Sequence, residues 1–162
     1  MATKKMMLSE QTIPPTPLPR IRLLVVDDEY HFEILLMQKF RHKIQQGEYE
    51  FYFSQSGQNA LDVFKEHPDI ELVITDINMP GMDGITLLKE IQRLYPQTKT
   101  MVMSAYSDEK RRDGAHQAGA IKFITKPISL KNLESTIEET IEEIVAERTN
   151  HAGTAACLPS AP

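Results

Sequence analysis

The chain has 162 residues, of which 41% are hydrophobic and 25% are charged, with a formal net charge of −5 and a sequence pI of about 5.5. This length suits a single domain, and the composition is typical of a folded globular protein rather than a disordered or fibrous one. The negative charge argues against direct binding to nucleic acid, which depends on clustered lysines and arginines. A single cysteine, Cys157, excludes an internal disulfide and fits a reducing compartment.

The two ends of the chain are expected to lie outside the fold. Residues 1–20 contain four prolines between Ile13 and Arg20, which favour an extended, disordered leader. Residues 149–162 are rich in small residues without periodicity, so we expect a disordered tail. One domain is left over residues 21–148. Because no stretch is apolar enough for a signal peptide or a membrane span, we expect a cytoplasmic protein with no membrane partner.

Between these ends, short apolar runs alternate with longer amphipathic segments, a pattern typical of repeated βα units. The apolar runs predict five strands, over Ile21–Val26, Tyr49–Phe53, Ile70–Thr75, Thr100–Met103 and Ile121–Ile124. The amphipathic segments predict five helices. Apolar stripes mark a helix from Phe32 to Phe40, another from Leu87 to Leu94, and a third from Leu130 to about Arg148. A weaker helix is predicted over Gln58–Glu66, and another over Ser107–Ala118 with Ser107 as its N-cap.

These segments combine into an α/β fold. Strands that are apolar throughout are covered on both faces, and short βα units wind right-handed, so we expect a doubly wound parallel sheet of five strands between two layers of helices. The helix over Ser107–Ala118 has almost no large apolar residues on any face. We therefore expect it to be held loosely.

Polar residues follow four of the five predicted strands, at the edge where open α/β sheets form their binding crevice. They are Asp27 and Asp28 after the first strand, Asp76 after the third, Ser104 after the fourth and Lys126 after the fifth. Crowded carboxylates repel one another unless a cation lies among them, and a set of oxygen ligands with room for water suits Mg²⁺. We expect Asp28 and Asp76 to bind the ion directly and Asp27 to act partly through water. The backbone carbonyl of Asn78 could supply a further ligand.

Asp76 also has the chemistry of a phosphoryl acceptor. A carboxylate attacks phosphorus to give an acyl phosphate when the charge on the transferring group is neutralised and the geometry is in line. Mg²⁺ and Lys126 would supply the neutralising charge, and the Ser104 hydroxyl would donate a hydrogen bond to a phosphoryl oxygen after transfer. No general base is needed, because the carboxylate is already ionised at neutral pH.

From about Ile21 to about Val145 the chain resembles the receiver domains of two-component response regulators, and is similar to the single-domain chemotaxis type. Four motifs carry the resemblance: Leu24-Val25-Val26-Asp27-Asp28-Glu29, the stretch Val73–Gly84 around Asp76, Met103-Ser104-Ala105, and Lys126-Pro127. The resemblance implies a flavodoxin-like fold with strand order 2-1-3-4-5. It also implies a phosphorylation-dependent switch, not an enzyme acting on outside substrates, that receives its phosphoryl group from a histidine kinase or a histidine phosphotransfer protein.

The resemblance further implies how the signal leaves the domain. The family's signalling face is built from the fourth helix, the fifth strand and the fifth helix, and its switch aromatic falls on Phe123. Phosphorylation of Asp76 would draw Ser104 and Lys126 toward the phosphoryl group, let Phe123 rotate inward and shift the loosely held fourth helix. A downstream protein effector is the expected partner, while a phosphorylation-dependent dimer and a cis Lys126–Pro127 bond stay open.

Two other classes of function share part of this pattern. Phosphatases of the haloacid-dehalogenase type also form an aspartyl phosphate, but their sites resemble Asp-x-Asp, and Asn78 stands at the position of the second, acid–base aspartate. A pseudo-receiver that docks partners without taking phosphate would not need the complete set of polar residues. Each residue also has an ordinary structural interpretation when taken alone. Asp27 and Asp28 could form an acidic first turn, Asp76 a turn, Ser104 a helix cap, Lys126 a solvated surface residue and Phe123 part of the core. The occurrence of the polar residues together, at four strand ends, favours a receiver site.

Overall fold

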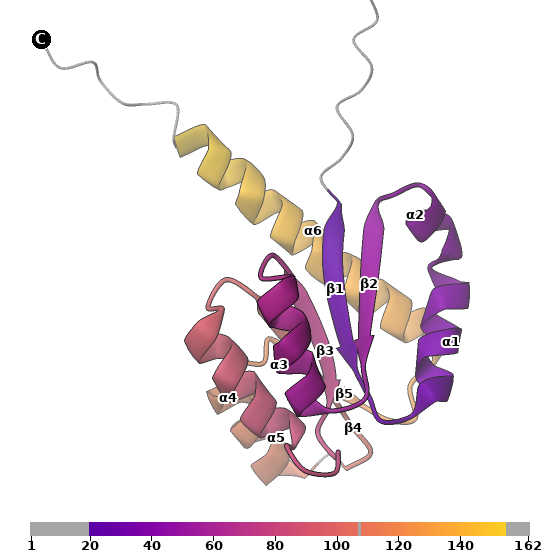
Figure 1. Cartoon of the computed structure of the whole chain (residues 1–162), viewed down its shortest axis with the longest axis vertical. Coiled ribbons are helices and arrows are strands. Elements are labelled where there is room, and N and C mark those ends of the chain that lie inside the picture. The colour runs from indigo at the N-terminus through magenta and orange to yellow at the C-terminus, as the bar shows by residue number, and fades with distance from the viewer. Residues whose placement is uncertain (1–19, 107, 155–162) are drawn as a thin grey trace, which may run out of the picture.

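The computed structural model describes residues 20–106 and 108–154, with side chains described as far as His151. It contains a five-stranded parallel sheet in the order β2-β1-β3-β4-β5, with helices on both faces (Figure 1). The strands are β1 (Ile21–Val26), β2 (Tyr49–Ser54), β3 (Leu72–Asp76), β4 (Lys99–Ser104) and β5 (Lys122–Thr125). The helices are α1 (Tyr30–Lys39), α2 (Arg41–Gln45), α3 (Gly57–Glu66), α4 (Gly84–Leu94), α5 (Glu109–Gln117) and α6 (Leu130–Thr154). The predicted fold class and strand order are confirmed.

The first predicted helix corresponds to α1, and a short helix that was not predicted, α2, follows it directly at Phe40. This residue ends α1 and precedes α2, with a backbone outside the helical region at φ −94° and ψ 11°. Its side chain is only 2% exposed and packs against the rings of Tyr49 and Phe51 on β2. The break therefore lies where an aromatic side chain is held in the core. As a result, the fourth and fifth helices of the predicted signalling face are α5 and α6 here.

Two predicted helix ends are corrected. Helix α5 is capped by Asp108, whose side chain accepts a hydrogen bond from the Arg111 backbone N–H at 2.9 Å; the predicted cap, Ser107, lies outside the described residues. Helix α6 continues to Thr154, so residues 149–154 do not belong to the tail expected after residue 148. No proline or glycine interrupts the helix before Gly153, and the Thr149 hydroxyl donates to the Val145 carbonyl at 2.9 Å. The leader over residues 1–19 and residues 155–162 lie outside the described part of the chain.

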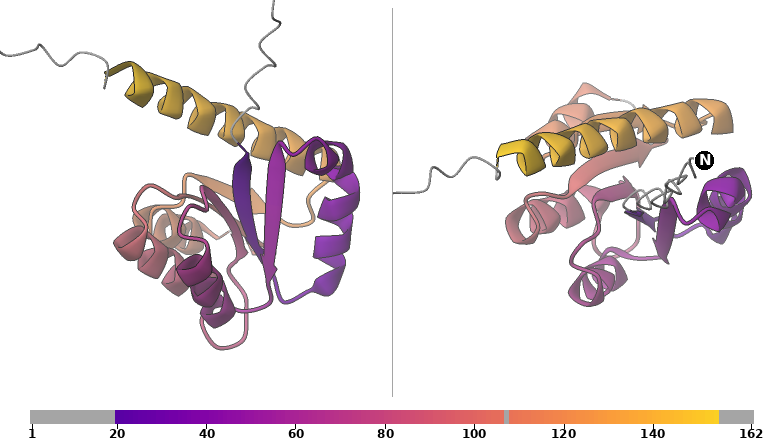
Figure 2. Two further views of the ribbon diagram at one scale, coloured as in Figure 1. Left: turned by 45° about the horizontal axis from the view of Figure 1, so that its top comes forward. Right: turned by 90° about the horizontal axis from the view of Figure 1, so that it is seen from above.

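Each face of the sheet carries its own apolar layer, with α6 on one face and α3 and α4 on the other (Figure 2). The layer under α1 and α6 includes Ile21, Leu23, Val25, Leu36, Met101, Leu133 and Ile137. The layer under α3, α4 and α5 includes Leu24, Val26, Phe64, Val73, Leu87, Val102 and Ala115. Successive side chains of β1 enter opposite layers because side chains alternate along a strand. This explains why the strands read as continuous apolar runs.

The parallel sheet brings distant polar residues to one edge. β1, β3, β4 and β5 all end at the same rim, so the residues that follow them are neighbours although they are far apart in sequence. The register pairs Asp76 with Met103 and Ser104 with Thr125 across adjacent strands. Among the described helices, none is long and apolar enough to cross a bilayer.

Candidate functional site

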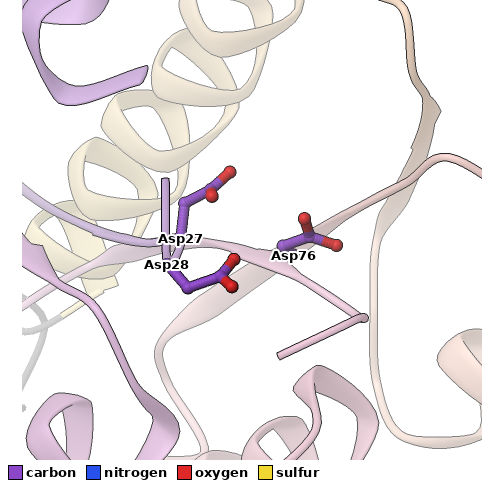
Figure 3. A group of neighbouring side chains, drawn as sticks. All are labelled: Asp27, Asp28 and Asp76. Atoms are coloured by element: carbon purple, nitrogen blue, oxygen red, sulfur yellow. The ribbon is translucent and has the colours of Figure 1, made fainter. Parts of the chain in front are cut away.

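Three carboxylates gather where β1 and β3 end (Figure 3). One oxygen from each of Asp27, Asp28 and Asp76 lies within 4.8 Å of the other two. Asp27 and Asp76 are 6% and 7% exposed, whereas Asp28 is open to solvent. Oxygen donors on one open rim suit Mg²⁺, which takes a small number of carboxylates and keeps several of its waters. The predicted acidic residues are therefore brought together in an arrangement that fits this ion.

Lys126 completes the group from the end of β5. Its ammonium lies 2.7 Å from Oδ2 of Asp76 and 3.1 Å from Oδ2 of Asp27. The backbone N–H of Lys126 donates to the carbonyl of Ser104 at 2.8 Å, which continues the β4–β5 pairing to this residue, and the following bond to Pro127 is cis. The cation thus bridges two buried carboxylates and offsets their mutual repulsion.

The protonation of these groups follows from burial and from their ion pairs. Burial is the largest influence on the Lys126 pKa and acts to lower it, but the hydrogen bonds and charges of Asp76 and Asp27 outweigh it and raise the pKa above its ordinary value. Burial is also the largest influence on Asp27, and it raises the pKa of that carboxyl against the opposing effects of the Glu29 backbone N–H and Lys126. Lys126 is therefore a cation at neutral pH.

The backbone around Asp76 fixes the direction of its carboxylate. The Asn78 N–H donates to Asp76 Oδ1 at 3.0 Å, and the buried Thr75 hydroxyl donates to the Asp76 carbonyl at 3.0 Å. Gly84, the first residue of α4, packs directly on this turn, so that a Cβ at Gly84 would overlap the Asp76 carbonyl oxygen. Asp83 caps α4 by accepting from the Thr86 N–H at 2.8 Å. No role was predicted for Gly84 from the sequence, because its contact with Asp76 depends on how closely α4 approaches the end of β3.

The two predicted switch residues lie on β4 and β5. Ser104 is fully buried, and its hydroxyl oxygen accepts a hydrogen bond from the Tyr106 N–H at 3.1 Å. Phe123 is half-buried and packs against the apolar cluster under α4 and α5. The guanidinium of Arg112 lies over its ring, 5.3 Å from the centroid. Their roles in switching stay predictions.

Arg111 of α5 also reaches the site, a contact that was not predicted from the sequence. Its Nη1 donates to the side-chain oxygen of Asn78 at 3.0 Å, and its guanidinium lies 4.8 Å from the centroid of the Tyr106 ring. The contact with Asn78 joins residues 33 positions apart and depends on how the loop after β3 approaches α5. No local sequence pattern could have indicated it.

Comparison with known proteins agrees with this arrangement. Residues 23–138 match the family model of the response regulator receiver domain. The chain belongs to this family. Receiver domains are phosphorylation-dependent signalling switches of two-component systems, and they interact with kinases and downstream effectors. The family, fold and switch function predicted from the sequence are therefore confirmed.

Individual receiver proteins resemble this one over most of its length. The chain is 35% identical over 121 residues to chemotaxis protein CheY of Bacillus subtilis (strain 168), covering 74% of this chain and 97% of that protein. It is 34% identical over 121 residues to transcriptional regulatory protein ZraR of Escherichia coli (strain K12), where the match covers 75% of this receiver chain but only 26% of ZraR. Among solved structures, a chain of the CheX–CheY–BeF3–Mg+2 complex from Borrelia burgdorferi aligns with a TM-score of 0.66 at 28% identity, covering 75% of this chain and 89% of that one.

Proposed function

We propose that this receiver domain accepts a phosphoryl group on Asp76 from the phosphohistidine of a histidine kinase or a histidine phosphotransfer protein. The observation that carries the proposal is the position of Asp76: its carboxylate lies beside those of Asp27 and Asp28, and 2.7 Å from the ammonium of Lys126. An Asp76 oxygen attacks phosphorus and forms the new P–O bond. The P–N bond breaks, and the imidazole nitrogen leaves with the bonding electron pair.

Mg²⁺ is the cofactor that we assign to this site. Asp28 and Asp76 would bind it directly, Asp27 would bind it partly through water, and the Asn78 backbone carbonyl would supply another ligand. When bound, the ion neutralises charge on the transferring phosphoryl group.

The remaining groups of the site are side chains of the domain. Lys126 orients the Asp76 carboxylate before transfer and pairs with a phosphoryl oxygen afterwards. The Ser104 oxygen accepts from the Tyr106 N–H, which leaves its own proton free to donate to the phosphoryl group.

The exposed side of α1 supports docking of the phosphoryl donor beside the acidic rim. Tyr30, Ile34 and Met37 are 56%, 40% and 41% exposed, and their spacing puts them on one side of the helix. Tyr30 follows Asp28 by two residues, so this apolar strip starts at the site. Exposed apolar patches bounded by polar residues are typical of protein interfaces.

The output proposed for the phosphorylated state is a changed surface over α5, β5 and α6. Ser104 and Lys126 move toward the phosphoryl group, Phe123 rotates inward and α5 shifts. The surface then binds a downstream protein effector in the cytoplasm, without direct contact with nucleic acid or membrane; a phosphorylation-dependent dimer on the same surface is the alternative that size measurement would detect. The net charge of −5 supports a protein partner over a nucleic acid.

Phosphorylation with a small donor tests the central step. The full chain is incubated with Mg²⁺ and acetyl phosphate, and the intact mass is measured beside Asp76→Asn and beside Asp62→Asn, a matched change at an exposed aspartate of α3. We expect one phosphoryl adduct on the wild type and on Asp62→Asn, and none on Asp76→Asn or after chelation of Mg²⁺. An equal adduct on Asp76→Asn would contradict the proposal.

A switch should catalyse only its own phosphorylation and slow dephosphorylation. Release of phosphate from small phosphomonoesters separates this function from that of a phosphatase with an aspartyl-phosphate intermediate. We expect no multiple turnover, because Asn78 cannot act as the acid–base carboxylate. Rapid turnover that depends on Asp76 would show an enzyme instead.

A further inference from the structure

Arg111 connects α5 to the phosphoacceptor through a short chain of hydrogen bonds. Its Nη1 donates to the Asn78 side-chain oxygen at 3.0 Å, and the Asn78 backbone N–H donates to Asp76 Oδ1 at 3.0 Å. The guanidinium lies over the Tyr106 ring and its Nε is 3.4 Å from Asp108 Oδ2. A single residue, Asn78, therefore separates a cation of α5 from the carboxylate that takes the phosphoryl group.

Helix α5 has few other attachments that could fix its first turns. Among its nine residues, only Ala115 is buried. Its other contacts include the Arg112 guanidinium over Phe123 and the capping bond at Asp108. An apolar helix face of this size resists displacement weakly, so a polar contact at the first turns can decide where they lie.

The partner that Arg111 has now is weaker than the one phosphorylation would provide. The Asn78 amide oxygen is neutral, whereas a phosphoryl group brings between about one and a half and two negative charges and three acceptor oxygens. Arginine and a phosphoryl group pair with charge on both partners and often through two parallel hydrogen bonds, whereas the neutral amide oxygen offers neither the charge nor the second acceptor. Arg111 and Asn78 also line a hollow of about 670 Å³ between α4 and α5, which leaves room for the guanidinium to turn.

We propose that Arg111 is a second sensor of the phosphoryl group on Asp76, an inference that rests on the function proposed above. After phosphorylation, its guanidinium leaves the Asn78 amide and donates to a phosphoryl oxygen. The first turns of α5 then move toward the loop between β3 and α4. This movement is driven by the negative charge of the phosphoryl group, and it is separate from the packing change that links Ser104 to Phe123.

Three variants distinguish a residue that senses the phosphoryl charge from one that only holds α5 in place. Arg111→Gln keeps a donor for the Asn78 oxygen but removes the charge, Arg111→Lys keeps the charge, and Lys110→Gln makes the same charge change at an exposed neighbour. Each full chain is titrated with beryllofluoride in the presence of Mg²⁺, and backbone amide shifts of α5 and β5 are followed by NMR. We expect Arg111→Gln to lose the shifts of the first α5 turns, keep those of Phe123 on β5, and bind beryllofluoride about tenfold more weakly. Arg111→Lys should restore most of both effects, and Lys110→Gln should behave as the wild type.

The outcomes separate this inference from the proposed function. If Arg111→Gln shows wild-type α5 shifts and affinity, or if Lys110→Gln loses as much as Arg111→Gln, Arg111 is not a sensor. If the wild type itself gives the same spectra as Asp76→Asn with beryllofluoride, the proposed function fails as well. High salt should reduce the difference between wild type and Arg111→Gln, because the contact is partly exposed to solvent.

Discussion

Helices α4 and α5 are neighbours on the same face of the sheet, but they are held in different ways. α4 buries Leu87, Leu88 and Ile91 completely, and its first residue packs against the backbone of Asp76. α5 buries Ala115 and reaches its surroundings mainly through arginines. Burial of one large aliphatic side chain contributes about 1.5 to 3 kcal/mol, whereas exposed cation contacts contribute about 1 kcal/mol or less.

This difference in packing agrees with the role expected of each helix. The site needs a rigid support at Asp76, and α4 supplies one by close packing. A helix that reports phosphorylation must move at low cost, and α5 meets this requirement because few apolar contacts are broken when it shifts. Four substitutions test whether the two helices differ as strongly as their packing indicates.

The largest effect is expected at the start of α4. In Gly84→Ala the new methyl group would overlap the Asp76 carbonyl oxygen and lie 2.9 Å from Ile77 Cα, both of them backbone atoms that cannot turn aside. We expect the free energy of unfolding to fall by about 4 kcal/mol, measured by urea denaturation. A loss below about 1 kcal/mol would show that α4 is not fixed to the site as described.

Leu88→Ala tests the buried side of α4. Leu88 is 0% exposed and belongs to the cluster that also contains Val102 and Ala115. Its truncation should lower the free energy of unfolding by about 3 kcal/mol, because it removes buried methyl groups and leaves a cavity. Leu94→Ala on the same helix is the matched control, since Leu94 is 47% exposed and should lose little.

Arg112→Ala tests the polar attachment of α5 to β5. The change removes the guanidinium over the Phe123 ring and a long hydrogen bond of 3.5 Å to the Thr125 hydroxyl. We expect a loss of global stability below about 1 kcal/mol. Hydrogen exchange of the α5 amides should nevertheless become faster, because the helix opens locally more often. A loss comparable with that of Leu88→Ala would remove the contrast between the helices.

The smallest effect, of opposite sign, is expected at Gly114 in the middle of α5. A Cβ there would lie 3.4 Å from the Ile85 side chain, an ordinary contact. Since glycine inside a helix is less favourable than alanine, Gly114→Ala should raise the free energy of unfolding by about 0.5 kcal/mol and slow α5 amide exchange. The pair Gly84→Ala and Gly114→Ala thus applies one chemical change to both helices with opposite expected results, and equal losses at both would contradict the comparison.

Local patterns in the sequence determined the sheet, its covering layers and the composition of the rim. Alternating apolar runs and helical stripes indicate βα units, and the parallel direction of the strands then requires Asp27, Asp76, Ser104 and Lys126 to come to one edge. The thin apolar face of α5 could likewise be read from its residues, and the structure confirms it. These features follow from composition and periodicity, which every segment carries within itself.

Only the tertiary structure decided where α1 ends at Phe40, why Gly84 must have no side chain, and which residue Arg111 contacts. Each depends on atoms from segments distant in the chain: the β2 aromatics for Phe40, the Asp76 carbonyl for Gly84 and the Asn78 amide for Arg111. Such contacts are set by the paths of loops and the distances between packed elements. Because several loop paths are compatible with the same local pattern of residues, the fold must be formed before these contacts are defined.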